Sequence, residues 1–96
     1  MRPARRPSPA RKSLHKAVIT TEDMAAAPSG QVYQLWLQQR GDMVSAGLMA
    51  GGGDEEIVLE GDAATASAVG VTVEPDGGSE EPNLPPVALF DFSEAT

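Results

Sequence analysis

The side chains best suited to chemistry are few and lie in short polar stretches. His15 is the single histidine and the chain has no cysteine, so a zinc site with the usual nitrogen and sulfur ligands is excluded within one chain. A serine hydrolase would need His15 folded against a serine and an acid, but His15 adjoins a segment that we expect to be disordered. We therefore expect an exposed His15, no catalytic residue, no cofactor, no metal and no enzymatic activity.

Two acidic groups could offer oxygen ligands to calcium. The first group consists of residues 54–56 and follows three glycines. The second group lies within residues 74–81, around a glycine pair. Both lack the regular ligand offsets of a calcium-binding loop. We interpret Asp54, Glu55 and Glu56 as a charged, solvent-exposed loop. For Glu74, Asp76, Glu80 and Glu81, weak cation binding stays open as an alternative that a calcium titration would test.

Two further features invite a recognition role but have simpler structural interpretations. Residues 40–42 spell the adhesion tripeptide Arg-Gly-Asp, yet Gly41 also supplies the positive φ that a tight hairpin turn requires. Tyr33 and Trp36 could serve as ligand platforms, but they lie on a run with period two. We therefore expect a hairpin turn at residues 40–42 and packing roles for both aromatic residues.

Charge divides the chain into two parts. Six of the seven basic residues lie in the first sixteen positions, which contain no acid, whereas the remainder carries fourteen acids against Arg40 alone. We expect residues 1–15 to form a disordered basic tail, residues 16–93 a folded acidic domain and residues 94–96 a short C-terminal tail. An acidic body repels phosphate backbones, so nucleic acid is not an expected partner of the folded part. Weak contact of the basic tail with anionic membrane or nucleic acid stays open.

Short runs with period-two alternation follow the tail. Tyr33, Leu35 and Leu37 share one face of residues 31–38, which we expect to be buried. Val69, Val71 and Val73 likewise form a core face, and we expect the alternate residues 70, 72 and 74 to be wet. Six short runs separated by turn signals predict an all-β fold, a small antiparallel β-sandwich of the immunoglobulin-like kind with six to seven short strands.

The stretch between the last two runs is unusual in composition. Pro75 lacks an N–H for a strand ladder and so marks the end of a strand, and residues 76–78 (Asp-Gly-Gly) allow a sharp reversal. Pro82, Pro85 and Pro86 then hold the returning segment extended until Val87 can pair. The connection is long but conformationally restrained, which reduces the entropy lost on folding.

These stretches, taken in order and spacing, carry a family resemblance. "VYQLWL" at residues 32–37, "SAGL" at 45–48 and "VTVEPDGGSEEPNLPP" at 71–86 resemble the C-terminal domain of the anti-sigma-K factor (RskA-like) family. The resemblance covers roughly residues 16–92. Its motif residues, to which we assign structural roles, are Tyr33, Leu35, Trp36, Gly47, Leu48, Val71, Val73, Glu74, Pro75, Gly77, Gly78, Ser79, Pro82 and Pro86.

The resemblance implies a non-catalytic regulatory domain. It implies the extracytoplasmic domain of a single-pass bacterial membrane protein, whose cytoplasmic segment sequesters an extracytoplasmic-function sigma factor until regulated proteolysis releases it. The implied partners are proteins: the rest of the anti-sigma factor and a protease or sensor. The implied location is the outer face of the plasma membrane.

The 96 residues depart from the family's full pattern. They contain no anti-sigma segment, no apolar run of the roughly 20 residues that span a bilayer and no export signal. We expect a fragment of a longer protein, so that membrane attachment would come from a missing N-terminal helix; the alternative is a stand-alone soluble binding module whose basic tail docks on anionic membrane or nucleic acid. "PNLPP" also replaces the family's usual Pro-Thr after Gly-Gly-Ser, which affects the loop surface.

Overall fold

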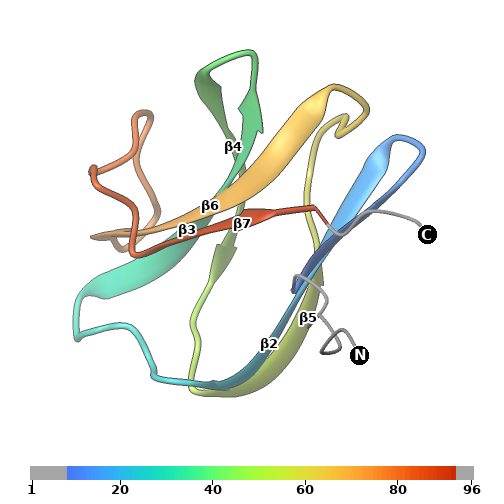
Figure 1. The fold of residues 1–96 in the computed structure, drawn as a ribbon. Coiled ribbons are helices and arrows are strands. Elements are labelled where there is room, and N and C mark those ends of the chain that lie inside the picture. Colours follow the sequence, from blue (N-terminus) through green and yellow to red (C-terminus); the bar gives the residue numbers. More distant parts are fainter. Residues whose placement is uncertain (1–8, 93–96) are drawn as a thin grey trace, which may run out of the picture.

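A computed structural model describes residues 9–92 as an all-β domain of two packed antiparallel sheets (Figure 1). The prediction of a small antiparallel sandwich with six to seven short strands is confirmed. The strands within this range are β1 (Ala10–Ser13), β2 (Lys16–Met24), β3 (Gln31–Gln39), β4 (Asp42–Met49), β5 (Gly53–Val58), β6 (Ala66–Pro75) and β7 (Ala88–Asp91).

One sheet has three strands and the other four. The three-stranded sheet has the order β1-β2-β5, and the four-stranded sheet has the order β4-β3-β6-β7. β3 and β4 form the expected hairpin, in which Gln39 pairs with Asp42 across a two-residue turn. Arg40 and Gly41 have φ values of 53° and 87°, the left-handed conformations that tight hairpin turns require. The tripeptide at residues 40–42 is therefore a turn, as predicted.

The core lies between the two sheets and follows the predicted alternation. Leu35 and Leu37 of β3 and Val69 and Val71 of β6 are buried there, facing Ile19 of β2. Their spacing of two places them on the same face of each strand, because successive side chains in a strand point to opposite faces. Residues 88–92 show the same alternation, with Phe90 packed against the core and Leu89 exposed.

The predicted boundary of the N-terminal tail at residue 15 is wrong. Residues 10–13 form β1, which pairs with β2 in the register Ala10 to Ile19 through Ser13 to Lys16. Ala10 is fully buried in the core, and an isolated parallel bridge joins it to Phe92. Figure 1 shows this junction, where the end of β7 lies beside the β1–β2 hairpin. The folded domain thus begins before residue 16. The sequence did not predict β1 because residues 10–13 show no alternation of apolar and polar side chains, and only the small side chain of Ala10 enters the core.

Other parts of the predicted tails lie outside the described residues, namely residues 1–8 and 93–96.

A second local prediction is also corrected within the described range. The acidic residues 54–56 were expected in a solvent-exposed loop, but they belong to β5, because Thr20, Thr21 and Met24 of β2 pair with Glu56, Glu55 and Gly53. Pairing with a neighbouring strand here outweighs the poor strand propensity of the acidic residues.

The largest correction concerns the second face of β3 and β6. Residues 70, 72 and 74 were expected to be wet, yet Thr72 and Glu74 are 0% and 1% exposed, and Trp36, which lies opposite Gly70, is 0% exposed. These side chains alternate with the core residues, so they point away from the space between the sheets. A second buried layer therefore covers the outer face of the four-stranded sheet. Among residues 9–92, no helix is long and apolar enough to cross a membrane.

Candidate functional site

The outer face of the four-stranded sheet is covered by the connection from β6 to β7, residues 76–87, which we call the β6–β7 loop. Pro75 ends β6 as predicted, and a turn follows in which the Gly78 N–H donates to the Pro75 carbonyl at 2.9 Å. The loop then crosses the sheet and returns to it where the Val87 N–H donates to the Val71 carbonyl at 2.8 Å.

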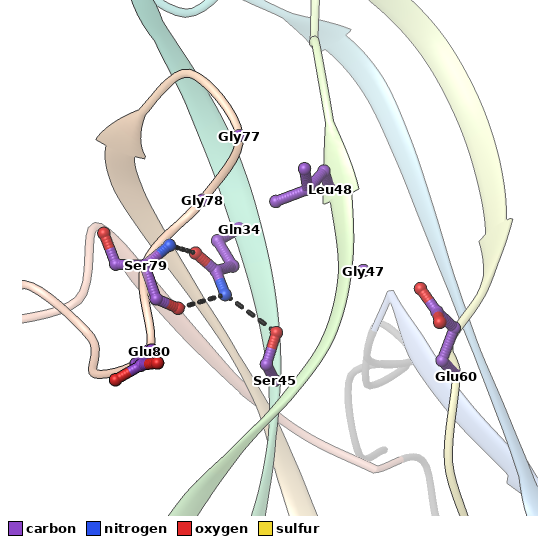
Figure 2. A pocket seen from close by; sticks show the side chains of 9 residues that line it. All are labelled: Gln34, Ser45, Gly47, Leu48, Glu60, Gly77, Gly78, Ser79 and Glu80. Atoms are coloured by element: carbon purple, nitrogen blue, oxygen red, sulfur yellow. Dashed lines mark hydrogen bonds between the residues drawn. The ribbon is translucent and has the colours of Figure 1, made fainter.

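A side chain of the central strand β3 holds the first half of this loop (Figure 2). The Gln34 amide accepts a hydrogen bond at Oε1 from the Ser79 N–H, at 2.8 Å, and donates from Nε2 to the Ser79 carbonyl, at 3.0 Å. Nε2 also donates to the Ser45 hydroxyl on β4 at 2.7 Å. The 2% exposed Gln34 therefore pairs with the loop backbone much as a neighbouring strand would.

Glu74 holds the second half of the loop. Its Oε2 accepts a hydrogen bond from the Asn83 N–H at 2.7 Å. Burial by itself raises the pKa of Glu74, but hydrogen bonds from the Asn83 N–H and from the hydroxyls of Thr72 and Ser79 outweigh that effect, so the pKa lies below its ordinary value. Glu74 is thus a buried carboxylate that stays ionised because the loop and the sheet solvate it.

Trp36 completes this polar layer. Its indole N–H donates to the Thr72 hydroxyl oxygen at 2.8 Å, and the Thr72 hydroxyl in turn bonds Glu74. Gly70 lies opposite Trp36 in the β3–β6 register, and the Met43 side chain packs directly over it, where a Cβ on Gly70 would clash. Trp36 is therefore a packing residue with a satisfied N–H, as expected, although it packs outside the main core.

The glycine pair of the loop has two different functions. Gly77 and Gly78 have φ values of 90° and 84°, which glycine adopts at little cost. A Cβ on Gly77 would meet nothing within 4 Å, whereas one on Gly78 would lie 2.9 Å from Gln34 Oε1 and 3.0 Å from Leu48 Cδ2. Gly77 serves the turn alone, and Gly78 also allows the loop to approach the sheet closely.

An open cavity of about 400 Å³ lies between this loop and strand β4. Figure 2 shows its lining residues. Gln34 comes from β3, Ser45, Gly47 and Leu48 come from β4, and Glu60 lies beyond them. The loop contributes Gly77, Gly78, Ser79 and Glu80. Leu48 is 45% exposed at its edge, so the cavity offers a partner both an apolar contact and polar groups.

The motif residues predicted from the sequence fall into two groups in the structure. Tyr33, Leu35, Val71 and Val73 belong to or pack against the main core, and Tyr33 also donates a hydrogen bond to the Ala25 carbonyl at 2.9 Å. Around the β6–β7 loop and its cavity lie Trp36, Gly47, Leu48, Glu74, Pro75, Gly77, Gly78 and Ser79. Pro82 and Pro86 lie within the loop itself.

Sequence reasoning missed the residues that anchor the loop. Gln34, Ser45, Thr72 and Asn83 were not singled out, although each supplies a hydrogen bond of the buried layer. The available signal was Trp36, because a large aromatic residue on the second, amphipathic face of residues 31–38 implies that something covers that face.

The remaining candidate residues lie apart from the loop site. His15 is exposed, as predicted, and its Nδ1 lies 3.2 Å from Asp62 Oδ1. A hydrogen bond from the Ala64 N–H, followed by the one from His15, lowers the pKa of Asp62 below its ordinary value. Residues 54–56 lie on β5. Among residues 9–92 no group of three or more histidine, cysteine or acidic side chains is placed to hold a metal ion.

The fold and the site together define a small β-sandwich domain whose buried polar layer serves to dock a loop, with an open cavity beside it. The family "Anti-sigma-K factor rskA, C-terminal" matches residues 9–87. The chain belongs to this family, and the resemblance identified from the motifs is confirmed. The match begins where the described structure begins, which agrees with the inclusion of β1 in the domain.

Individual relatives agree with the family. An uncharacterised protein in the phr 5′ region of Streptomyces griseus is 47% identical over 85 residues, covering 88% of this chain and 36% of the relative. Anti-sigma-K factor RskA of Mycobacterium sp. (strain KMS) is 38% identical over 83 residues, covering 80% of this chain and 32% of the relative. The chain thus spans about a third of the length of the curated relatives it matches. No solved structure matches the chain significantly.

Proposed function

We propose that this domain is the extracytoplasmic regulatory part of an anti-sigma factor that controls an extracytoplasmic-function sigma factor. It acts by protein contacts and not by catalysis, and it lies on the outer face of the bacterial plasma membrane. The observation that carries the proposal is the family match over residues 9–87, together with relatives named as anti-sigma-K factors.

The structure supports a role based on contacts and stability. The motif residues build a core and a docked loop, and both of these are structural tasks. A domain of this kind controls access to neighbouring chain by staying folded, because local or global unfolding exposes segments to proteases in proportion to the open population. A partner that binds only the folded or only the open form shifts that population by its differential affinity.

Cell fractionation with an antibody against the domain tests the proposal. We expect a membrane-bound band well above 10.0 kDa, which is degraded when protease is added to intact spheroplasts. A soluble band at 10.0 kDa, or a membrane band that added protease reaches only after lysis, contradicts the proposed location.

A transcription assay tests the regulatory part separately. Deleting the coding segment for residues 9–92 from the chromosomal gene should change expression from the promoter of the associated sigma factor. The matched control is the Arg11→Asp substitution, which alters only an exposed side chain of β1 and should leave expression unchanged. Equal expression in the deletion strain and the parent would overturn the proposed regulatory role.

A further inference from the structure

Residues 9–92 do not close the two sheets along the side where β2 and β7 lie. β1 has four residues and β2 has nine, so β1 covers only the first half of one edge of β2. In the described part of the chain, the last backbone hydrogen bond on that edge runs from the Thr20 N–H to the Pro9 carbonyl, at 3.0 Å. Beyond it, no strand of residues 9–92 pairs with Thr21–Met24 on this side.

β7 leaves a second open edge facing the same place. It pairs with β6 on one side, and on the other side the one pairing within residues 9–92 is the isolated parallel bridge from Ala10 to Phe92, the residue that follows β7. β1 thus touches both edges at Ala10, and the two edges diverge from that point (Figure 1). Open strand edges of this kind are templates for pairing with another chain.

An apolar groove fills the gap between these edges. It has a volume of about 260 Å³, and its walls include Met24 of β2, Val71 of β6 and Ala88 and Phe90 of β7. Met24, Ala88 and Phe90 are only partly buried, although they pack against the main core. The Thr21 hydroxyl also borders the groove, and it is buried without a hydrogen-bond partner in the described part of the chain. The core is therefore incompletely covered here.

Glu22 is one of the residues that line the groove, and further acidic side chains lie beside it. A neighbouring depression of about 260 Å³ is lined by Glu22, Asp54, Glu55 and Glu56, beside Thr20 and Thr21. Thr20 and Glu56 are opposite each other in the β2–β5 register, and both are exposed. A strand laid along β2 would thus meet apolar side chains on one of its faces and carboxylates on the other.

We propose that the groove between β2 and β7 receives an extended segment of a second polypeptide, which continues the line of β1 antiparallel to β2. Its recognition features follow from the two faces. Small apolar side chains at every second position cover Met24 and Phe90, and arginine or lysine at the alternate positions faces Glu22 and Glu56. This surface differs from the cavity beside the β6–β7 loop, and the proposal stands whether or not the domain regulates a sigma factor.

The backbone geometry identifies the residue that would pair first. Alternate residues of a strand direct their N–H and carbonyl groups to the same edge. Since the Thr20 N–H faces the β1 side, alternation assigns the next N–H on the open edge to Glu22, where the β2–β5 register begins to shift between Thr21 and Met24. The two sheets stay intact when this N–H is lost, because the β2–β5 ladder uses Ala17, Ile19 and Thr21 on the opposite edge.

A nuclear magnetic resonance titration of the full 96-residue chain tests the proposal. The probe is a synthetic peptide in which valine and arginine alternate. We expect amide shifts at Thr21 and Glu22 and at Ala88 to Phe90, with contacts that place the peptide antiparallel to β2. A peptide with glutamate in place of arginine, and one with proline in place of valine, should not bind. Binding of the glutamate peptide, or shifts confined to other surfaces, would overturn the proposal.

Two substitutions separate backbone pairing from charge. Glu22→Pro removes both the N–H and the carboxylate, whereas Glu22→Ala removes the carboxylate alone. Loss of one hydrogen bond predicts a dissociation constant about three- to tenfold higher for Glu22→Pro than for Glu22→Ala. Circular dichroism melting checks that both variants fold. Equal affinities of two folded variants would contradict strand pairing.

The first residues of the chain itself are the competing occupant. Nuclear Overhauser contacts from residues 5–8 to Glu22 and Ala88 in the peptide-free chain would mean that the groove is filled by its own chain, which overturns the proposal. Absence of such contacts, together with saturable binding of the alternating peptide, supports it.

Discussion

Trp36 is fully buried on the face of β3 that points away from the sandwich core. Its N–H is paired with Thr72, so the residue combines a large apolar area with a satisfied polar group. At this scale the stability of the outer layer rests on a few side chains, each of which has a specific partner. Two of these residues give sharp tests.

Replacing Trp36 with alanine should lower the free energy of unfolding by about 3–5 kcal/mol, because a buried aromatic residue leaves a cavity that the sheet cannot fill. The control is Trp36→Phe, which keeps a ring and loses the N–H, and should cost less. Urea unfolding followed by circular dichroism measures both, since Trp36 is the only tryptophan and its fluorescence disappears. An unchanged midpoint in Trp36→Ala would mean that the residue serves recognition and not packing.

Glu74 should make stability depend on pH in the acidic range. Its pKa in the folded state lies below the ordinary value of 4.5. The carboxylate therefore contributes stability above about pH 4.5, and this contribution is lost as the pH falls through the folded-state pKa. We expect the difference in unfolding free energy between the parent and Glu74→Gln to shrink progressively below that pH.

Asp62 provides the matched control for this experiment. Its pKa is also lowered, but the residue is exposed at the surface, so Asp62→Asn should leave most of the acid sensitivity in place. A Glu74→Gln variant with the same pH profile as the parent would contradict the assignment of Glu74 as an ionised anchor of the loop.

At the scale of elements, the β6–β7 loop is the part of the fold that does most to distinguish it from a plain sandwich. It is fixed at Ser79 and Asn83 by side chains from two strands, and its glycine pair permits both the turn and the close approach. The loop and the sheet beneath it are therefore one structural unit, and damage to the contact should be visible as lost stability.

Comparing Gly77→Ala with Gly78→Ala isolates that contact. Both substitutions place a Cβ at positive φ, at a cost of about 1–2 kcal/mol. Gly78→Ala also forces a Cβ against Gln34 and Leu48, which should cost a further 1–3 kcal/mol or so. Urea unfolding followed by Trp36 fluorescence measures both. Equal losses would show that the loop does not need to lie close to Gln34.

The elements also show which features were predictable. Strands β3, β4 and β6 and the turn at residues 40–41 followed from local alternation and glycine placement. β1 did not, because the basic stretch around Ala10 has no apolar periodicity, and it becomes a strand by pairing with β2, with one further bridge from Ala10 to Phe92. The buried outer layer was missed for the same reason: local alternation assigns Thr72 and Glu74 to a solvent-exposed face, and only the folding of the β6–β7 loop against that face buries them.

At the scale of the whole molecule, β1 joins the two sheets. Ala10 pairs with Ile19 in one sheet and with Phe92 at the edge of the other. Lys12 strengthens the same junction, since its ammonium donates to the Ala66 carbonyl at 2.8 Å and lies 5.2 Å from the centre of the Phe92 ring. Residues assigned from composition to a tail thus hold the sandwich together.

Ala10→Asp should therefore destabilise the whole domain. A carboxylate at this fully buried position would be removed from water, and burying a charge in this way costs about 3–5 kcal/mol unless β1 detaches. Arg11→Asp places the same charge on the adjacent exposed residue and should change stability by about 0.5 kcal/mol or less.

Thermal unfolding by circular dichroism compares the two variants, and Trp36 fluorescence reports the four-stranded sheet separately. If β1 joins the sheets, the melting temperature of Ala10→Asp falls for both signals together, because the core between the sheets opens as one unit. A lower stability seen by circular dichroism alone, with the Trp36 transition unchanged, would mean that β1 is a local addition. Equal melting of Ala10→Asp and Arg11→Asp would mean that the sandwich does not depend on β1 at all.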